Sequence, residues 1–226
     1  LFNESHMQYE ADRGNDVAGE PSIAEMTTAA IKVLDNNEEG FFLMVESGRI
    51  DHAHHAGNAY GALHDAIAFS EAVEAADALT NDEDTLIIVT ADHGHVFTIA
   101  GYPKRGNPIL GKVVSVGSTE ATLASDGMPY TTVGYTNGLG HRNLIGATDA
   151  DKGYNEAINT GRINLTAINT MDSGYHQEAN IPLGSETHAG EDISVHAMGP
   201  GAQLVQGNIE QSVIFHIINK ALGLTE

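Results

Sequence analysis

Apolar residues recur at helical spacing in three stretches of this 226-residue chain. The first begins after Ser22, a candidate N-cap that is followed three residues later by Glu25, and predicts a helix over about 22–36. An alanine-rich stretch predicts a second helix over about 58–79. A third helix is predicted over about 208–222, where isoleucine and valine share one face.

Short, continuous apolar runs predict strands between these helices. The runs at 41–45 and 86–89 are typical of strands buried on both faces, and 193–198 predicts a further strand. A strand, a helix and a strand in this order predict a mostly parallel sheet with helices on its faces. The segment 101–184 is richer in Gly, Asn, Thr and Pro, and we interpret it as a partly β insertion.

Composition narrows the classes of protein that fit. The length suits one main domain, and no apolar stretch approaches the length of a membrane span. Ten basic against 31 acidic residues give a formal charge of -21, which argues against nucleic acid and anionic membranes as partners. Such acidity is typical of halophilic proteins and of acidic secreted proteins. Because there are no cysteines, any metal must be held by His and carboxylate ligands.

Three clusters of carboxylates and imidazoles accompany the predicted strands. The segment 46–55 contains two carboxylates and three histidines, and a helical turn there would place Asp51 and His55 on one face. Asp92 and His93 follow the next strand, and His188 precedes the last. Each cluster alone fits a surface or turn histidine equally well. Together they predict a metal site at one edge of the sheet, beyond the strand ends.

These segments resemble the motifs of the alkaline phosphatase family, in the family's order. The matching stretches are Val45–His55, Thr90–Gly94 and Glu186–Asp192, and shorter landmarks such as Arg105–Gly111 and Met198–Gly201 extend the likeness over nearly the whole chain. The resemblance implies a three-layer α/β/α sandwich. Residues 1–100 and 185–226 would form the C-terminal part of the metal-binding catalytic domain, and 101–184 a crown-like insertion.

The resemblance also implies roles for individual residues. Asp51, His55 and His188 would hold one zinc ion, Asp92 and His93 would contribute to a second, and Glu46 would bind magnesium. His95 would hold Asp51 from outside the metal's ligand sphere, although a simple loop histidine is the alternative. His52 matches a position close to bound phosphate, where a cation would favour the anionic ester.

The family's nucleophilic serine lies in an Asp-Ser-Ala segment that this chain does not contain. Asp172–Ser173 is followed by glycine and tyrosine and lies in the wrong part of the pattern, so we reject it as the nucleophile. The remaining histidines match no ligand position; they are His6, His54, His64, His141, His176, His196 and His216.

We therefore expect an alkaline phosphatase, a phosphoric monoester hydrolase that acts through a phosphoserine intermediate with two Zn²⁺ and one Mg²⁺. Its partners would be phosphate monoesters, inorganic phosphate, the missing N-terminal portion that carries the nucleophile, and a second copy in a homodimer. A periplasmic or secreted location would suit it. The alternatives are a related phosphodiesterase or sulfatase, and a metal-binding fragment without activity.

Overall fold

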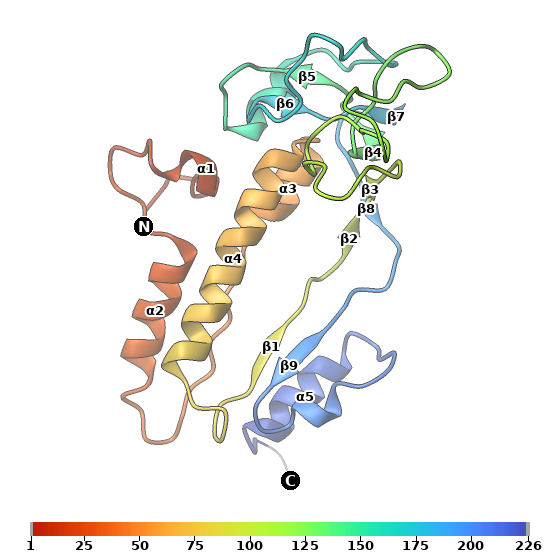
Figure 1. Cartoon of the computed structure of the whole chain (residues 1–226). Helices are drawn as coiled ribbons and strands as arrows, with labels where there is room; N and C mark the ends of the chain where they lie inside the picture. Colours follow the sequence, from red (N-terminus) through yellow and green to blue (C-terminus); the bar gives the residue numbers. More distant parts are fainter. Residues whose placement is uncertain (1, 225–226) are drawn as a thin grey trace. The chain divides into compact units, whose positions relative to one another are not determined.

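The computed structural model describes residues 2–224, and its longer helices lie where the apolar periodicity predicts them (Figure 1). The three predicted helices are α2 (Ile23–Leu34), α4 (Ala59–Leu79) and α5 (Val213–Ala221). Two shorter helices are α1 (Glu10–Arg13) and α3 (Arg49–His55). The α3 helix confirms the helical turn that places Asp51 and His55 on one face.

The described chain divides into two units. The first unit holds the segments Leu1–Ser22, Glu46–Ala68 and His95–Ala189. The second unit holds Ile23–Val45, Phe69–Gly94 and Gly190–Glu226. The first unit contains α3 and the whole of 101–184, so this division does not follow the predicted domain boundaries. The crown-like role of 101–184 stays a prediction.

The first unit contains small sheets. Strand β4 (Val133–Gly138) runs antiparallel to β3 (Phe97–Ile99) and parallel to β7 (Ala179–Pro182). A second pair joins β5 (Arg142–Asn143) to β6 (Tyr175–His176). Three further short elements are β2 (Gly94–His95), the 3₁₀ helix η1 (Ala150–Asn155) and β8 (His188–Ala189).

The core of the first unit is built around one tyrosine and several alanines. Tyr9, Ala53 and Ala56 are fully buried, and Ala62 and Ala150 are nearly so. Small side chains allow α3, the first turns of α4 and η1 to approach closely, as close packing in a protein interior requires. This packing fixes α3, which carries the two most informative ligand candidates.

The junction between α3 and α4 has a local cause in the sequence. Gly57 has φ +72°, its N–H donates to His54 O, and the N–H of Asn58 donates to Ala53 O, which is the Schellman ending of a helix. The Asn58 side chain then accepts a hydrogen bond from Gly61 N at 2.6 Å and so caps the start of α4. Two adjacent residues thus end one helix and begin the next.

The second unit is more open. Strand β1 (Ile87–Val89) pairs antiparallel with β9 (His196–Met198), which a short 3₁₀ helix, η2 (Ala202–Leu204), follows. Its buried residues, among those described, are Thr27, Ile31, Ala72 and Ile217. A hollow of about 820 Å³ lies within this unit, lined among others by Phe41, Leu43, Val73, Ile88, Ile214 and Ile218.

The structure corrects one strand prediction. Residues 41–45 are extended but pair with no strand among the described residues, and Phe42 and Met44 are 60% and 76% exposed. A strand buried on both faces needs neighbours at both edges and cover on both sides, which residues 2–224 do not supply here. The expected parallel pairing with 86–89 is therefore absent from the described chain, and the three-layer sandwich stays a prediction.

No helix among residues 2–224 combines the length and the apolarity needed to cross a lipid bilayer.

Candidate metal centre

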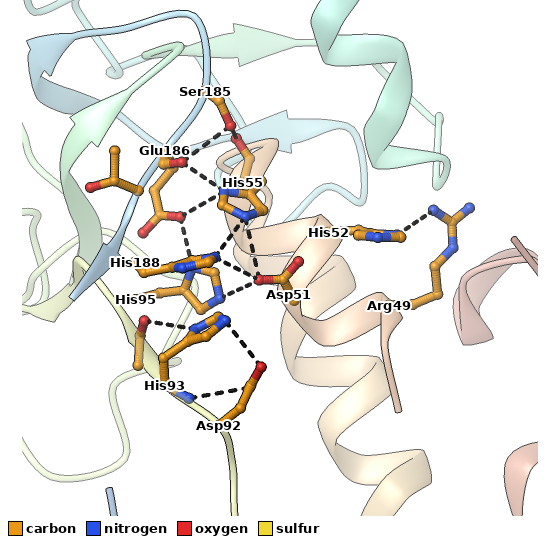
Figure 2. Close-up of polar contacts among 12 residues, drawn as sticks. Arg49, Asp51, His52, His55, Asp92, His93, His95, Ser185, Glu186 and His188 are labelled. Atoms are coloured by element: carbon orange, nitrogen blue, oxygen red, sulfur yellow. Dashed lines mark hydrogen bonds and ion pairs between the residues drawn. The ribbon is translucent and has the colours of Figure 1, made fainter. Parts of the chain in front are cut away.

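The α3 helix brings a carboxylate of its first turn and an imidazole of its last turn together. Asp51 Oδ1 lies 3.3 Å from His55 Nε2, across one helical turn. His188, from β8, completes a triangle: its Nε2 lies 3.4 Å from Asp51 Oδ1 and 3.1 Å from His55 Nε2 (Figure 2). Residues from two distant segments of the sequence, α3 and β8, thus converge within the first unit.

The triangle has the dimensions of a tetrahedral zinc site. Zinc binds His nitrogen and carboxylate oxygen at about 2.0 to 2.2 Å, so two ligands of a tetrahedral ion lie about 3.3 to 3.5 Å apart. The three observed separations, 3.1 to 3.4 Å, match that spacing. Asp51, His55 and His188 therefore fit one zinc ion as a donor set, and three protein ligands leave a fourth position open.

The ring of His55 is oriented for this role by backbone atoms. His55 Nδ1 lies 2.7 Å from the carbonyl oxygen of Glu186, which can only accept, so Nδ1 carries the proton. In the neutral ring this leaves the lone pair of Nε2 for a metal. The N–H of Glu186 donates to His55 O at 3.0 Å and ties the same two segments together.

Two contacts place the strand that carries His188. Thr187 N donates to Asn137 Oδ1 at 3.0 Å, and Asn137 Nδ2 donates to Thr187 Oγ1 at 2.9 Å. Gly138 has φ +137°, and a Cβ built on it would lie 3.2 Å from the Cβ of Glu186. Only glycine permits this approach without displacing the segment that leads to His188.

His95 lies between two carboxylates. Its Nδ1 is 2.7 Å from Glu186 Oε2 and its Nε2 is 3.0 Å from Asp51 Oδ1. Burial alone would lower the pKa of His95, but the hydrogen bond and charge of Glu186, with the charge of Asp51, raise it overall. The ring thus contacts Asp51, and such partners orient a ligating carboxylate. That His95 holds a metal ligand in this way stays a prediction.

Glu186 is a site residue that the sequence reasoning missed. Its side chain is fully buried; Oε1 accepts from Val96 N at 2.8 Å and Oε2 contacts His95. One atom each of His55, His95 and Glu186 lie within 4.8 Å of one another, so this group could also hold a cation. The available signal was its position at the head of the Glu186–His188 motif.

His54 is buried behind the centre and is not a ligand candidate. Its ring stacks on His95 with the centroids 4.6 Å apart, and its Nδ1 lies 2.9 Å from the hydroxyl of Tyr135. Burial, followed by the charges of His95 and His55, lowers its pKa to about 3, so the ring is neutral. His54 thus packs against His95 and supports its ring.

Asp92 and His93 lie in the second unit and form a pair. His93 Nε2 is 3.3 Å from Asp92 Oδ2, the spacing of two ligands on one ion. His93 Nδ1 lies 3.3 Å from Gly94 O, which again favours a free lone pair on Nε2. The Asp92 side chain is 79% exposed.

Glu46 is exposed at the end of the extended segment 41–45. The structure gives it no neighbouring ligand among the described residues, so its magnesium role stays a prediction. Asp172 and Ser173 lie in a turn: Asp172 Oδ1 accepts from Gly146 N and Gly174 N, and the backbone oxygen of Ser173 accepts from Asn58 Nδ2. Their rejection as the nucleophile stays a prediction.

His52 is in contact with Arg49. Arg49 Nη1 lies 3.1 Å from its Nδ1, and a guanidinium can only donate. Burial, followed by the charges of His6 and Arg49, lowers the pKa of His52. Nδ1 therefore accepts in this contact, and the expected place of His52 close to bound phosphate stays a prediction.

Comparison with known proteins adds the family. The sequence profile of the family described as alkaline phosphatase matches residues 1–224. The chain belongs to the alkaline phosphatase family. It is 42% identical over 218 residues to the tissue-nonspecific alkaline phosphatase of Felis catus, a match that covers 96% of this chain and 37% of that protein. The alkaline phosphatase of Gadus morhua is 38% identical, with 96% and 41% covered.

The fold agrees with this membership. The crystal structure of Thermus thermophilus alkaline phosphatase superposes with a TM-score of 0.59 at 23% identity, covering 99% of this chain and 52% of that one. The alkaline-phosphatase-like fold is therefore present. The chain spans less than half the length of the two relatives named above.

Proposed function

We propose that this chain supplies the metal-binding part of an alkaline phosphatase that hydrolyses phosphate monoesters. The observation that carries the proposal is the triangle of Asp51 Oδ1, His55 Nε2 and His188 Nε2, with sides of 3.1 to 3.4 Å. Membership of the family adds the reaction class. A homodimer in the periplasm or outside the cell, with inorganic phosphate as product, is part of the same proposal.

The cofactors we propose are two Zn²⁺ and one Mg²⁺. When bound, the metals would supply electrophilic stabilisation for a nucleophile, a leaving oxygen and an attacking water. Asp51, His55 and His188 would hold one zinc, Asp92 and His93 would contribute to the other, and Glu46 would serve the magnesium. Glu186 and His95 would keep the rings and the Asp51 carboxylate in position.

The nucleophile is proposed to be a serine from polypeptide outside these 226 residues, phosphorylated and then hydrolysed in each turnover. Two observations support a covering polypeptide. The second unit leaves an apolar hollow of about 820 Å³. Beside it, residues 41–45 are extended without a partner strand in the described chain. Exposed apolar surface of this kind marks an interaction site.

The proposal is tested by activity with and without the covering polypeptide. The purified 226-residue chain, loaded with zinc and magnesium, should show no appreciable turnover of p-nitrophenyl phosphate. Adding the proposed N-terminal polypeptide, or expressing both as one chain, should restore turnover. Robust activity of the isolated chain would overturn the missing-nucleophile part, and a reconstituted enzyme that cleaves only diesters or sulfate esters would overturn the substrate class.

A further inference from the structure

Arg49, the first residue of α3, is held by three contacts besides the one with His52. Its Nε donates to the carbonyl oxygen of Met7 at 2.8 Å, and its Nη1 lies 3.0 Å from Asp151 Oδ2. The guanidinium carbon lies 4.0 Å from the ring centroid of Tyr9, as in a cation–π contact. The side chain of Arg49 is only 16% exposed.

The groups that hold Arg49 are themselves fixed. Tyr9 is fully buried, and its hydroxyl donates to Asp151 Oδ1 at 2.7 Å. Asp151 belongs to η1, whose first turn is capped by the Asp149 side chain. We call Tyr9, Arg49 and Asp151 the Arg49 clamp. It joins the N-terminal segment, α3 and the region of 101–184 within the first unit.

The clamp presents one N–H to His52. Arg49 Nη1 lies 3.1 Å from His52 Nδ1 (Figure 2). Because a guanidinium has no acceptor, the bond forms only when Nδ1 offers its lone pair, and the ring proton must then sit on Nε2. The ring of His6 packs edge-on against the same imidazole, with the centroids 4.3 Å apart, and limits its rotation.

We propose that Arg49 is a positioning residue, which fixes the ring plane of His52 and keeps the single ring proton on Nε2. His52 then offers one oriented N–H donor. That this donor serves a phosphate oxygen rests on the proposed function; the proton position and the ring orientation do not.

The proton position is measured directly on the 226-residue chain. Long-range ¹H–¹⁵N correlation of the ¹⁵N-labelled protein at pH 8 distinguishes protonated from bare ring nitrogens, and His52→Asn assigns the resonances. We expect the proton of His52 on Nε2, with a ¹⁵N–¹⁵N coupling across the hydrogen bond to Arg49. A proton on Nδ1 would overturn the proposal whatever the activity of the enzyme.

Variants separate positioning from general stability. In Arg49→Met the minor Nδ1–H form should rise about fivefold, the factor expected for one lost hydrogen bond. Arg49→Lys should restore the wild-type pattern in part. Arg162→Met is the matched control, because that guanidinium pairs with Asp126 and Glu178 instead, and it should change nothing at His52.

If Arg49→Met fails to fold, Asp151→Asn tests the proposal instead. This variant keeps an acceptor for the Tyr9 hydroxyl but removes the negative charge opposite Arg49. It should raise the minor form by a smaller factor. A population that stays at the wild-type value in Asp151→Asn would overturn the proposal.

Discussion

The two units differ in how far they bury their own side chains. In the first unit, Tyr9, Leu165 and Tyr175 are fully buried, and they come from segments far apart in the sequence. In the second, four described residues are buried, and an apolar hollow of about 820 Å³ remains. The first unit thus supplies its own core, whereas the second needs cover from other polypeptide.

The metal donors reflect the same difference. Asp51, His55 and His188 form a complete triangle whose members are oriented by buried groups such as Glu186. Asp92 and His93 form a pair at 3.3 Å in which the carboxylate is largely exposed. A site held by rigid surroundings loses less entropy on binding, so we expect the first unit to bind zinc without help.

The largest expected effect is on zinc binding, when one ligand of the triangle in the first unit is removed. The isolated chain should bind about one zinc ion tightly, and Asp51→Ala or His188→Ala should weaken that binding by more than about 100-fold, since changes behind the ligands alone cost 10- to 100-fold. Calorimetric titration and metal content by plasma mass spectrometry measure this.

Histidines of the second unit supply the controls for that experiment. His93→Ala, in the second unit, should leave the tight zinc within about threefold of the wild type, and His196→Ala should have no effect. Equal losses in Asp51→Ala and His93→Ala would show that the triangle is not a self-sufficient site.

The next largest effect is a difference between the two units in how much a truncated apolar side chain costs in stability. Leu165 is fully buried in the first unit. Leu165→Ala should lower the free energy of unfolding by about 2 to 4 kcal/mol. Met44 is 76% exposed in the second unit, and Met44→Ala should cost less than about 0.5 kcal/mol. Urea unfolding followed by circular dichroism gives both values. Comparable costs would mean that the second unit is packed in solution.

The smallest effect concerns a carboxyl buried in the first unit. Burial raises the pKa of Asp65 to about 7, although a hydrogen bond from Glu10 N opposes the shift. The folded state therefore binds a proton that the unfolded state releases at about pH 4, and stability falls as pH rises from about 4 to 7.

Asp65→Asn removes this dependence. Above pH 7 the variant should be more stable than the wild type by about 1 to 3 kcal/mol, and the difference should vanish below pH 4. Asp82→Asn, an exposed carboxyl of the second unit, is the control and should change stability by less than about 0.5 kcal/mol at any pH. A constant difference between pH 4 and 9 would contradict the shift.

The sequence by itself determined the three longer helices and placed Asp51 and His55 on one helical turn; their role as metal ligands stays a prediction. Apolar periodicity placed α2, α4 and α5, because helix burial follows a local repeat. The spacing of Asp51 and His55 on one turn, together with the family motifs, singled out the triangle. These signals are local in the chain, so one sequence suffices to read them.

The tertiary structure alone decided the surroundings of those residues. Three contacts show this: Glu186 with His95, His54 with His95, and Asp151 with Arg49. They join residues about 40 to 100 positions apart, and contacts between such distant positions leave no local pattern in the sequence. Residues 41–45 show the converse. Their composition predicts a buried strand, but burial depends on neighbours that residues 2–224 do not provide.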